Sequence, residues 1–373
     1  MRRESRTKPG LAFGILCVLA GSLHAAPYTL IDLGDIPGGQ DFSWAQDINN
    51  AGQVAGFSEG ASDWRAFRWN STAGMQDLGT LPGGDDFSWA WGINDAGQVV
   101  GGSGWANEQA FLWESGRGMQ GLGALPGTSA SRALGIDSNG QVVGWSGERA
   151  FVWDGVNGMR DLNTVLDAGS SGWTLESANA INDHGWIIGT GRTATGVQSF
   201  LYDTLHGIQS LSISANAINE NGYVVGSDGQ HAFLWDSMSG THDLGDLPGG
   251  DDVSWANAIN DAGQVVGAGT TAVGQRAFLW DSVNGMRDLN ALLDAGGEGW
   301  TLTEAWAVND RGWIVGVGEN PGGAGHAFLL VPEPASLIMM AVGLGGLARR
   351  RQLVLFTERP AQERKKPWDE NHI

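Results

Sequence analysis

The chain repeats one cassette seven times, and this period constrains its fold more than any other feature. Each copy follows the pattern Ile-Asn-Asp-x-Gly-Gln-Val-Val-Gly, then x-Ala-Phe-Leu-Trp, then Gly-Met-x-Asp-Leu. The Ile-Asn pair or its equivalent recurs at intervals of 37 to 49 residues, about 43 on average, which is typical of a four-stranded propeller blade. The Ala-Phe element also recurs seven times, with Ser199 in place of Ala in one copy, so two anchors give the same number of units.

Each copy contains four short runs of alternating or β-branched residues bounded by Gly, Asn, Asp or Pro, which predicts four strands. The first two strands of a copy are joined by a tight Asx-and-Gly turn, such as 260–263, while the connections between copies are longer. Alternate connections of an up-and-down sheet emerge at opposite ends. We therefore expect tight turns on one face and long loops on the other. The Gly after each Val-Val pair, such as Gly267, is predicted to end the second strand.

The two ends of the repeat region are complementary. The seventh copy stops after Ala327-Phe328-Leu329-Leu330 and lacks its Asp-Leu strand, whereas residues 28–34 supply one. Pairing the two would close a ring and cover two sheet edges. The sequence thus predicts an all-β fold, a seven-bladed β-propeller of four-stranded blades over residues 27–330, closed by the N-terminal strand. An open β-solenoid is the alternative, and it needs no complementary ends.

The N-terminal segment is typical of a secretory signal peptide. Four basic residues precede the apolar run 11–20, and Ala25-Ala26 suit a cleavage site, so residues 1–26 are predicted to be removed. Cys17, the only cysteine, lies in this segment, and the mature protein would then have no disulfides.

The C-terminal segment combines a Pro-Glu-Pro motif, an apolar stretch at 335–348 and an arginine cluster; these residues are Pro332, Glu333, Pro334, Arg349, Arg350 and Arg351. It resembles the PEP-CTERM sorting signal of Gram-negative bacteria, here spanning 331–351. The resemblance implies processing by an exosortase, a short transmembrane helix that anchors the chain transiently in the inner membrane, and delivery to the cell surface or extracellular matrix. The apolar stretch is shorter than the roughly 20 residues that span a bilayer. An atypical polar tail, 352–373, follows it.

The repeats resemble the extracellular HAF repeats, named for His-Ala-Phe. The triplet occurs at 231–233 and 326–328, and the other copies carry Arg or Gln in the first position. The resemblance covers nearly all of residues 28–330. It implies a secreted protein of repeated β units and transfers no catalytic residues.

The net charge of the predicted mature domain limits the classes of ligand that it can bind. Residues 27–348 contain no Lys and 10 Arg against 36 Asp and Glu, a net charge near −26. Such a field repels nucleic acid and anionic membranes, which excludes nucleic-acid binding as a main role. It favours cations, neutral glycans or solubility alone.

Acidic and aromatic residues gather in the predicted long loops and in two matching inserts that begin at Leu166 and Leu293, 127 residues apart. The predicted ligand surface comprises Asp85, Asp86, Asp251, Asp252, Trp64, Trp105, Trp173 and Trp300. Carboxylates beside indoles suit saccharides or Ca²⁺. Because no Asp-x-Asp-x-Asp loop is present, we expect no cofactor, with Ca²⁺ as the weaker hypothesis. The alternative is that the Asp residues cap turns and the Trp residues fill space between blades.

Catalytic motifs are missing from the sequence: it has no His-x-x-x-His pair, no Gly-x-Ser-x-Gly elbow and no phosphate-binding loop. We therefore predict a non-catalytic binding or structural module of the extracellular matrix, with a polysaccharide or matrix protein as partner. The alternative is a propeller hydrolase acting on extracellular polysaccharide. Carboxylates clustered at the channel mouth would favour the hydrolase, and an apolar channel would favour the module.

Overall fold

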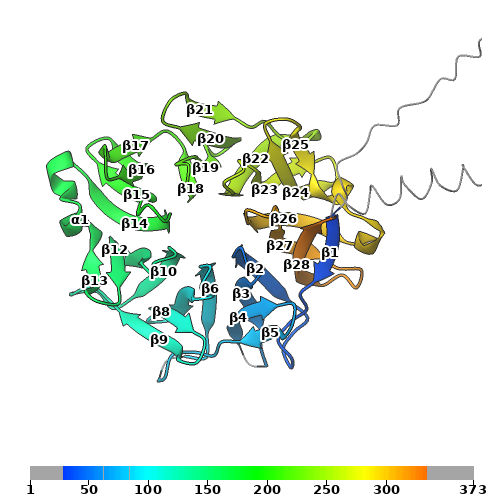
Figure 1. Ribbon diagram of the computed structural model, residues 1–373, viewed down its shortest axis with the longest axis horizontal. Coiled ribbons are helices and arrows are strands. Elements are labelled where there is room, and N and C mark those ends of the chain that lie inside the picture. Colours follow the sequence, from blue (N-terminus) through cyan, green and yellow to red (C-terminus); the bar gives the residue numbers. More distant parts are fainter. Residues whose placement is uncertain (1–27, 62, 84, 334–373) are drawn as a thin grey trace, which may run out of the picture.

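The computed structural model describes residues 28–61, 63–83 and 85–333, which form seven four-stranded antiparallel sheets around a central axis (Figure 1). This confirms the all-β, seven-bladed propeller. The predicted signal peptide, apolar C-terminal stretch and polar tail lie outside the described residues. Within the described ranges, no helix has the length and apolar character needed to cross a membrane.

The blades are numbered along the chain, and the first strand of each is the innermost (Figure 1). Blades 1 to 3 comprise β2 (Ser43–Ile48), β3 (Val54–Glu59), β4 (Trp64–Asn70), β5 (Gly74–Asp77); β6 (Ser88–Ile93), β7 (Val99–Ser103), β8 (Gln109–Glu114), β9 (Gly118–Gly123); β10 (Ser131–Ile136), β11 (Val142–Ser146), β12 (Arg149–Asp154), β13 (Gly158–Asp161). Blades 4 to 6 comprise β14 (Thr174–Ile181), β15 (Ile187–Thr193), β16 (Gly196–Asp203), β17 (Gly207–Leu211); β18 (Ser214–Ile218), β19 (Val224–Ser227), β20 (Ala232–Asp236), β21 (Gly240–Asp243); β22 (Gly249–Ile259), β23 (Val265–Thr271), β24 (Gly274–Asp281), β25 (Gly285–Asp288). Blade 7 comprises β26 (Thr301–Val308), β27 (Ile314–Glu319), β28 (Gly325–Pro332) and β1 (Tyr28–Asp32).

Strand β1 closes the ring, as predicted. Asp32 pairs with Phe328 in the register that Asp77 keeps with Phe67 in blade 1. Strand β28 extends through Pro332, and the Thr29 hydroxyl lies 2.7 Å from the Glu333 carboxylate. Pro332 of the Pro-Glu-Pro motif therefore belongs to the closing sheet, and Glu333 contacts it through Thr29.

Every innermost strand carries a β-bulge just after its central Ala, which shifts the register by one residue. In blade 1 the bulge brings the Trp44 carbonyl against Gly56, where an added Cβ would overlap that oxygen. Gly56 and Gly267 lie inside β3 and β23 and do not end them. The prediction that these glycines terminate strands was wrong, because they make room for a bulge.

The hydrophobic core lies in the seams between blades. The Phe of each Ala-Phe element is central to it; the fully buried rings are Phe67, Phe111, Phe151, Phe200, Phe278 and Phe328. Most seams also contain a buried Ser. Ser43 accepts the Ala327 N–H at 3.0 Å and donates to the Gly34 carbonyl at 2.5 Å, so its hydroxyl is fully satisfied.

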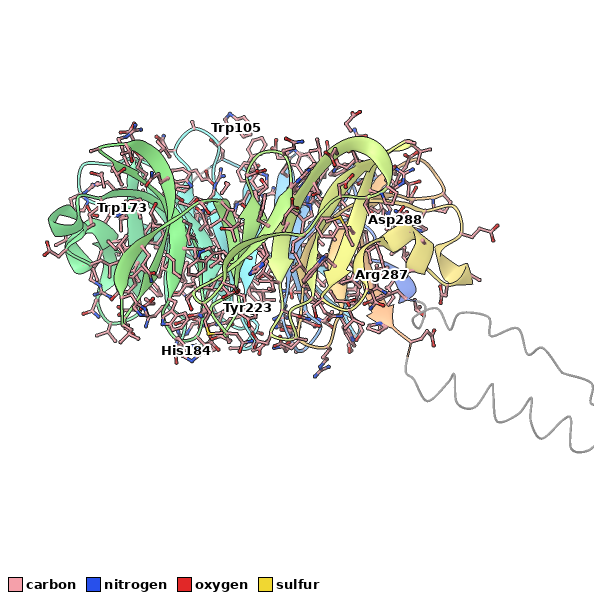
Figure 2. All side chains as sticks on the ribbon, turned by 90° about the horizontal axis from the view of Figure 1, so that it is seen from above. Trp105, Trp173, His184, Tyr223, Arg287 and Asp288 are labelled. Atoms are coloured by element: carbon pink, nitrogen blue, oxygen red, sulfur yellow. The ribbon has the colours of Figure 1, made fainter. Side chains whose placement is uncertain are left out.

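The two ends of the ring differ as expected. The Asx-Gly turns and the short turns before the fourth strands share one end, the tight-turn face. The connections between blades and between second and third strands share the other, the loop face. Figure 2 shows Trp105 on the loop face, with His184 and Tyr223 on the tight-turn face.

The two matching inserts connect blade 3 to blade 4 and blade 6 to blade 7. They contain α1 (Leu162–Val165) with η1 (Ala168–Ser171), and η2 (Leu289–Leu292) with η3 (Ala295–Gly297). Each begins with an Asp N-cap followed by an Asn side chain that donates to and accepts from the next innermost strand, Asn163 with Leu175 and Asn290 with Leu302. The inserts are thus structurally equivalent, but they lie three blades apart.

Candidate functional site

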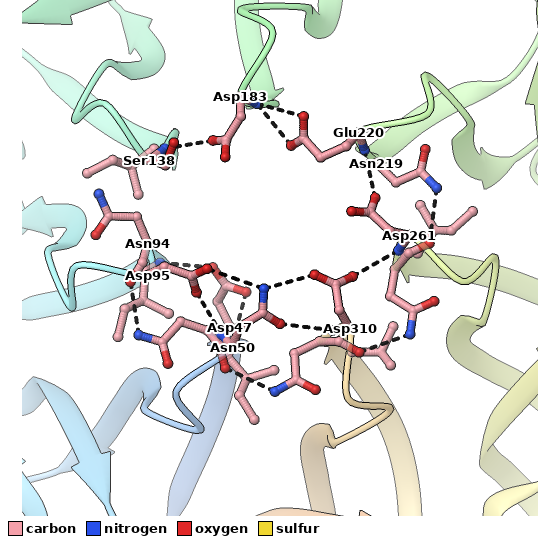
Figure 3. Close-up of a pocket in the computed structure, with 18 of the residues that line it drawn as sticks. Asp47, Asn50, Asn94, Asp95, Ser138, Asp183, Asn219, Glu220, Asp261 and Asp310 are labelled. Atoms are coloured by element: carbon pink, nitrogen blue, oxygen red, sulfur yellow. Dashed lines mark hydrogen bonds between the residues drawn. The ribbon is translucent and has the colours of Figure 1, made fainter.

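The channel mouth on the tight-turn face forms a polar cavity of about 250 Å³ (Figure 3). One polar side chain from each Asx turn surrounds it: Asn50, Asp95, Ser138, Asp183, Glu220, Asp261 and Asp310. The mouth therefore holds clustered carboxylates, which is the arrangement that was expected to favour a hydrolase.

These ring side chains are occupied by backbone donors. All except Ser138 accept the N–H at the equivalent position of the preceding blade; the Asn50 N–H donates to Asp95 at 2.7 Å, and the Asp310 N–H to Asn50 at 3.0 Å. Four more seams repeat the contact. At the remaining seam no such bond from Asp95 is found in the described structure, because the Ser138 side chain is short. The carboxylates thus join neighbouring blades.

A second ring lies beneath the first and is built from the Asn of each Ile-Asn pair. Its amides donate to the carbonyl of the next blade at 2.9 to 3.0 Å in six seams. Blade 3 has Asp137 instead, whose ionised carboxylate has no proton to donate to the next seam. Burial raises the pKa of Asp137.

Asp47 lies at the same mouth and accepts the N–H groups of Ile48 and Ile93, each at 2.8 Å. Burial raises its pKa to about 6 despite these donors. The described residues include no group of three or more His, Cys, Asp or Glu side chains placed to hold a metal ion.

On the loop face, the Arg or His before several Ala-Phe elements binds nearby acids. His231 lies 2.9 Å from Asp243 and 3.5 Å from Asp252, and Arg65 lies 3.5 Å from Asp86. Two of the predicted ligand residues, Asp86 and Asp252, are therefore ion-paired within the loops. Asp252 also adopts a left-handed φ of 59°.

The remaining predicted residues are scattered. Asp85 accepts the backbone N–H of Trp105 at 3.4 Å. The Trp105 side chain is 69% exposed and packs on Phe87 and Trp89. Asp251 is exposed, with its N–H bonded to Thr270. Thus only Asp85 and Trp105 of the predicted set come together by direct contact.

The insert tryptophans and Trp64 are packing residues. Trp64 stands edge-on against Phe42 and Phe57, and Trp300 contacts the His326 ring. Trp173 corrects the prediction of a ligand surface: it is 8% exposed, because it fills the core beside Phe200.

A cleft of about 420 Å³ opens on the loop face where blade 7 meets blade 1. We call it the blade 7 cleft; Phe42 and Trp44 supply its aromatic lining, and Gln275, Glu304 and Glu319 supply its polar lining. Glu304 is 9% exposed and accepts hydrogen bonds from Trp255 Nε1 at 2.9 Å, Asn257 at 3.1 Å and Gln275 at 3.4 Å. Three donors therefore fix the position of this carboxylate.

The bulged residues of the innermost strands divide the channel into two parts. In blades 4 to 6 the bulged Asn donates to the next blade, as Asn257 does to the Ala305 carbonyl at 3.0 Å. In blades 7 and 2 the bulged residues are Trp306 and Trp91, and their indole N–H groups are buried without a partner, as is that of Trp44. Trp44 and Trp306 are in ring contact at 5.9 Å. Donors left unpaired in this way cost stability unless an acceptor reaches them.

The sequence analysis did not predict that Glu304, Glu319 and Phe42 line one cleft. A signal for Glu304 was available: it occupies the position of Trp44, Trp89 and Trp255 in other copies, so it breaks the repeat. The grouping with Glu319 depends on how blades 7 and 1 meet.

The fold and the tail together define an exported β-propeller. A family model described as the PEP-CTERM protein-sorting motif matches residues 330–352. The match confirms the sorting signal, which marks an exported protein that is sorted toward the cell envelope or surface and processed by an exosortase-type enzyme. No curated protein matches the chain in sequence.

Among solved structures, the chain is similar to a sialidase of Trypanosoma rangeli. The two are 12% identical, and they superpose with a TM-score of 0.34 over 79% of this chain and 61% of the sialidase chain. The same sialidase in complex with sialic acid is also 12% identical, with a TM-score of 0.35 over 91% of this chain and 64% of the other. The chain therefore spans less than two thirds of these sialidase chains.

Proposed function

We propose that this protein is a non-catalytic binding module of the extracellular matrix, and that it holds a polysaccharide in the blade 7 cleft. The proposal rests on one observation: an aromatic wall, Phe42 and Trp44, borders the same cleft as Gln275 and two carboxylates. Aromatic faces stack on sugar rings, and amide and carboxylate groups bind sugar hydroxyls. Export through the sorting signal would deliver the module to where such polymers lie.

The hydrolase alternative is favoured by the carboxylates at the tight-turn mouth. General acid catalysis needs a carboxylic acid whose proton can reach the glycosidic oxygen. The ring carboxylates accept backbone N–H groups across the blade seams, and Glu304 accepts three side-chain donors. These contacts support architecture and binding more than proton transfer.

The test is retention of the purified protein on immobilised neutral, amino and acidic polysaccharides, with release of reducing ends measured in parallel. Trp44→Ala removes one of the two rings of the aromatic wall, and Trp313→Ala, a half-buried Trp of the same blade seam on the tight-turn face, is the matched control. We expect retention without cleavage that Trp44→Ala abolishes and Trp313→Ala preserves. Cleavage, or equal loss in both variants, would contradict the proposal.

A further inference from the structure

Glu319 differs from the other acids around the blade 7 cleft. It is exposed at the end of β27, and its carboxylate has no hydrogen bond or ion pair among the described residues. Nearby acids are already engaged: Asp41 contacts His326 at 2.6 Å, and Glu304 accepts three bonds. Glu304 has only uncharged donors, so among the described residues no cation pairs with either carboxylate of the cleft, and Glu319 is the one that also has no hydrogen-bond donor.

The surrounding charge strengthens this preference for a cation. Residues 27–348 contain 10 Arg and no Lys. Seven of those Arg are already paired with acids, including Arg132, whose guanidinium binds Glu108 through two bonds of 2.7 Å. The net field of the domain is consequently negative, and an anionic polysaccharide would be repelled at physiological salt.

The cleft also needs a hydrogen-bond acceptor. Trp44 lines the cleft, and its indole N–H is buried without a partner among the described residues. An acetamide group offers a carbonyl acceptor together with a methyl group that suits an indole face. An ammonium group would pair with Glu319 and is also attracted to Trp and Phe faces.

We propose that the blade 7 cleft binds an amino-sugar polymer in which some units are N-acetylated and others carry a free amine. This inference rests on the proposed function and specifies its ligand class. The acetamide carbonyl accepts from the Trp44 indole N–H, the sugar ring stacks on Phe42 or Trp44, and the ammonium group pairs with Glu319.

The experiment measures binding of glucosamine hexamers that are fully acetylated, partly acetylated or fully deacetylated, with a glucose hexamer and poly-lysine as comparison ligands. The protein is tested as wild type, Glu319→Gln and Glu148→Gln. Glu148 is the matched control, because it is an exposed acid in the corresponding hairpin of blade 3, away from the cleft. Binding of the glucosamine hexamers is also measured as a function of salt concentration.

The partly acetylated hexamer should bind at least tenfold more tightly than the glucose hexamer. Glu319→Gln should weaken binding of the partly acetylated hexamer about fivefold and reduce the salt dependence of that binding, in keeping with the loss of one solvent-exposed ion pair. Glu148→Gln should leave both unchanged.

Three outcomes would overturn the inference, and they are distinguishable. Equal binding of the glucose hexamer, unaffected by Glu319→Gln, would leave the polysaccharide module standing with a different ligand class. Binding of poly-lysine without any sugar would assign the cleft to a cationic peptide. Failure of every hexamer and every polysaccharide to bind would remove the proposed function itself.

Discussion

The two ends of the seven innermost strands follow different rules. At the tight-turn end, six of the seven blades bind the next blade through nearly identical bonds from an Asn amide to a backbone carbonyl. At the loop end, the residue before each central Ala is not constant: it is Trp in three blades, Ser in two, Arg in one and Glu in one; in order these are Trp44, Trp89, Arg132, Ser177, Ser214, Trp255 and Glu304. Uniformity therefore marks what closes the ring, and we propose that departure from the repeat marks where a ligand is recognised.

The first way to test this comparison is to break the uniform end. Asn309→Leu removes the donor to the Asn49 carbonyl and the acceptor for the N–H groups of Arg311 and Trp313, all within a buried turn. We expect a loss of about 3 kcal/mol in unfolding free energy, measured by urea denaturation. Glu319→Gln at the opposite end should change stability by less than about 0.5 kcal/mol. A similar loss in both variants would erase the distinction.

A second prediction repairs the uniform end. Asp137→Asn supplies the amide that blade 3 lacks and should add about 1 kcal/mol of stability at pH 7. Burial raises the folded-state pKa of Asp137, so the wild-type protein loses stability as pH rises from the unfolded value through the folded one. The gain should therefore be largest near neutrality and shrink toward pH 3. A gain that does not vary with pH in urea unfolding would refute this mechanism.

The third and smallest prediction concerns the loop end. His326 is 6% exposed and contacts Asp32 at 2.9 Å and Asp41 at 2.6 Å. Burial lowers its pKa, but the hydrogen bonds to the two aspartates outweigh burial and raise the net value. This stabilisation is complete below the unfolded pKa, near 6.5, and is lost as pH rises through the folded pKa.

His326→Gln should consequently cost up to about 1 kcal/mol at pH 5.5 and less at pH 9. Thermal unfolding at the two pH values provides the measurement, with His184→Gln, an exposed His on the tight-turn face, as control. A cost that grows with pH would show that the aspartates do not stabilise the charged imidazole.

The sequence was sufficient for the architecture because a propeller blade is defined by its own repeat. Seven Ala-Phe elements and the complementary ends at 28–34 and 327–330 indicated the number of blades and their closure. The bulges were not predictable from strand periodicity, since the Gly that permits a bulge resembles a Gly that ends a strand.

The candidate site was predicted less well, because it depends on differences among repeats and on contacts between blades. The aspartates after the Pro-Gly-Gly turns were predicted to be ligand residues because they recur in several copies. In the structure, however, Asp86 contacts Arg65 and Asp252 contacts His231. Glu319 looked like an ordinary surface acid in sequence. Its importance follows from the cleft that it shares with Trp44.

The most direct test of the central claim compares one variant from each end, Asn309→Leu and Trp44→Ala, for unfolding free energy and for binding of the partly acetylated glucosamine hexamer. The account predicts that Asn309→Leu lowers stability by about 3 kcal/mol and preserves the affinity, whereas Trp44→Ala weakens binding at least tenfold in a protein that remains folded. If Asn309→Leu abolished binding in a folded protein, or if Trp44→Ala left binding unchanged, the assignment of closure to one end and recognition to the other would be contradicted.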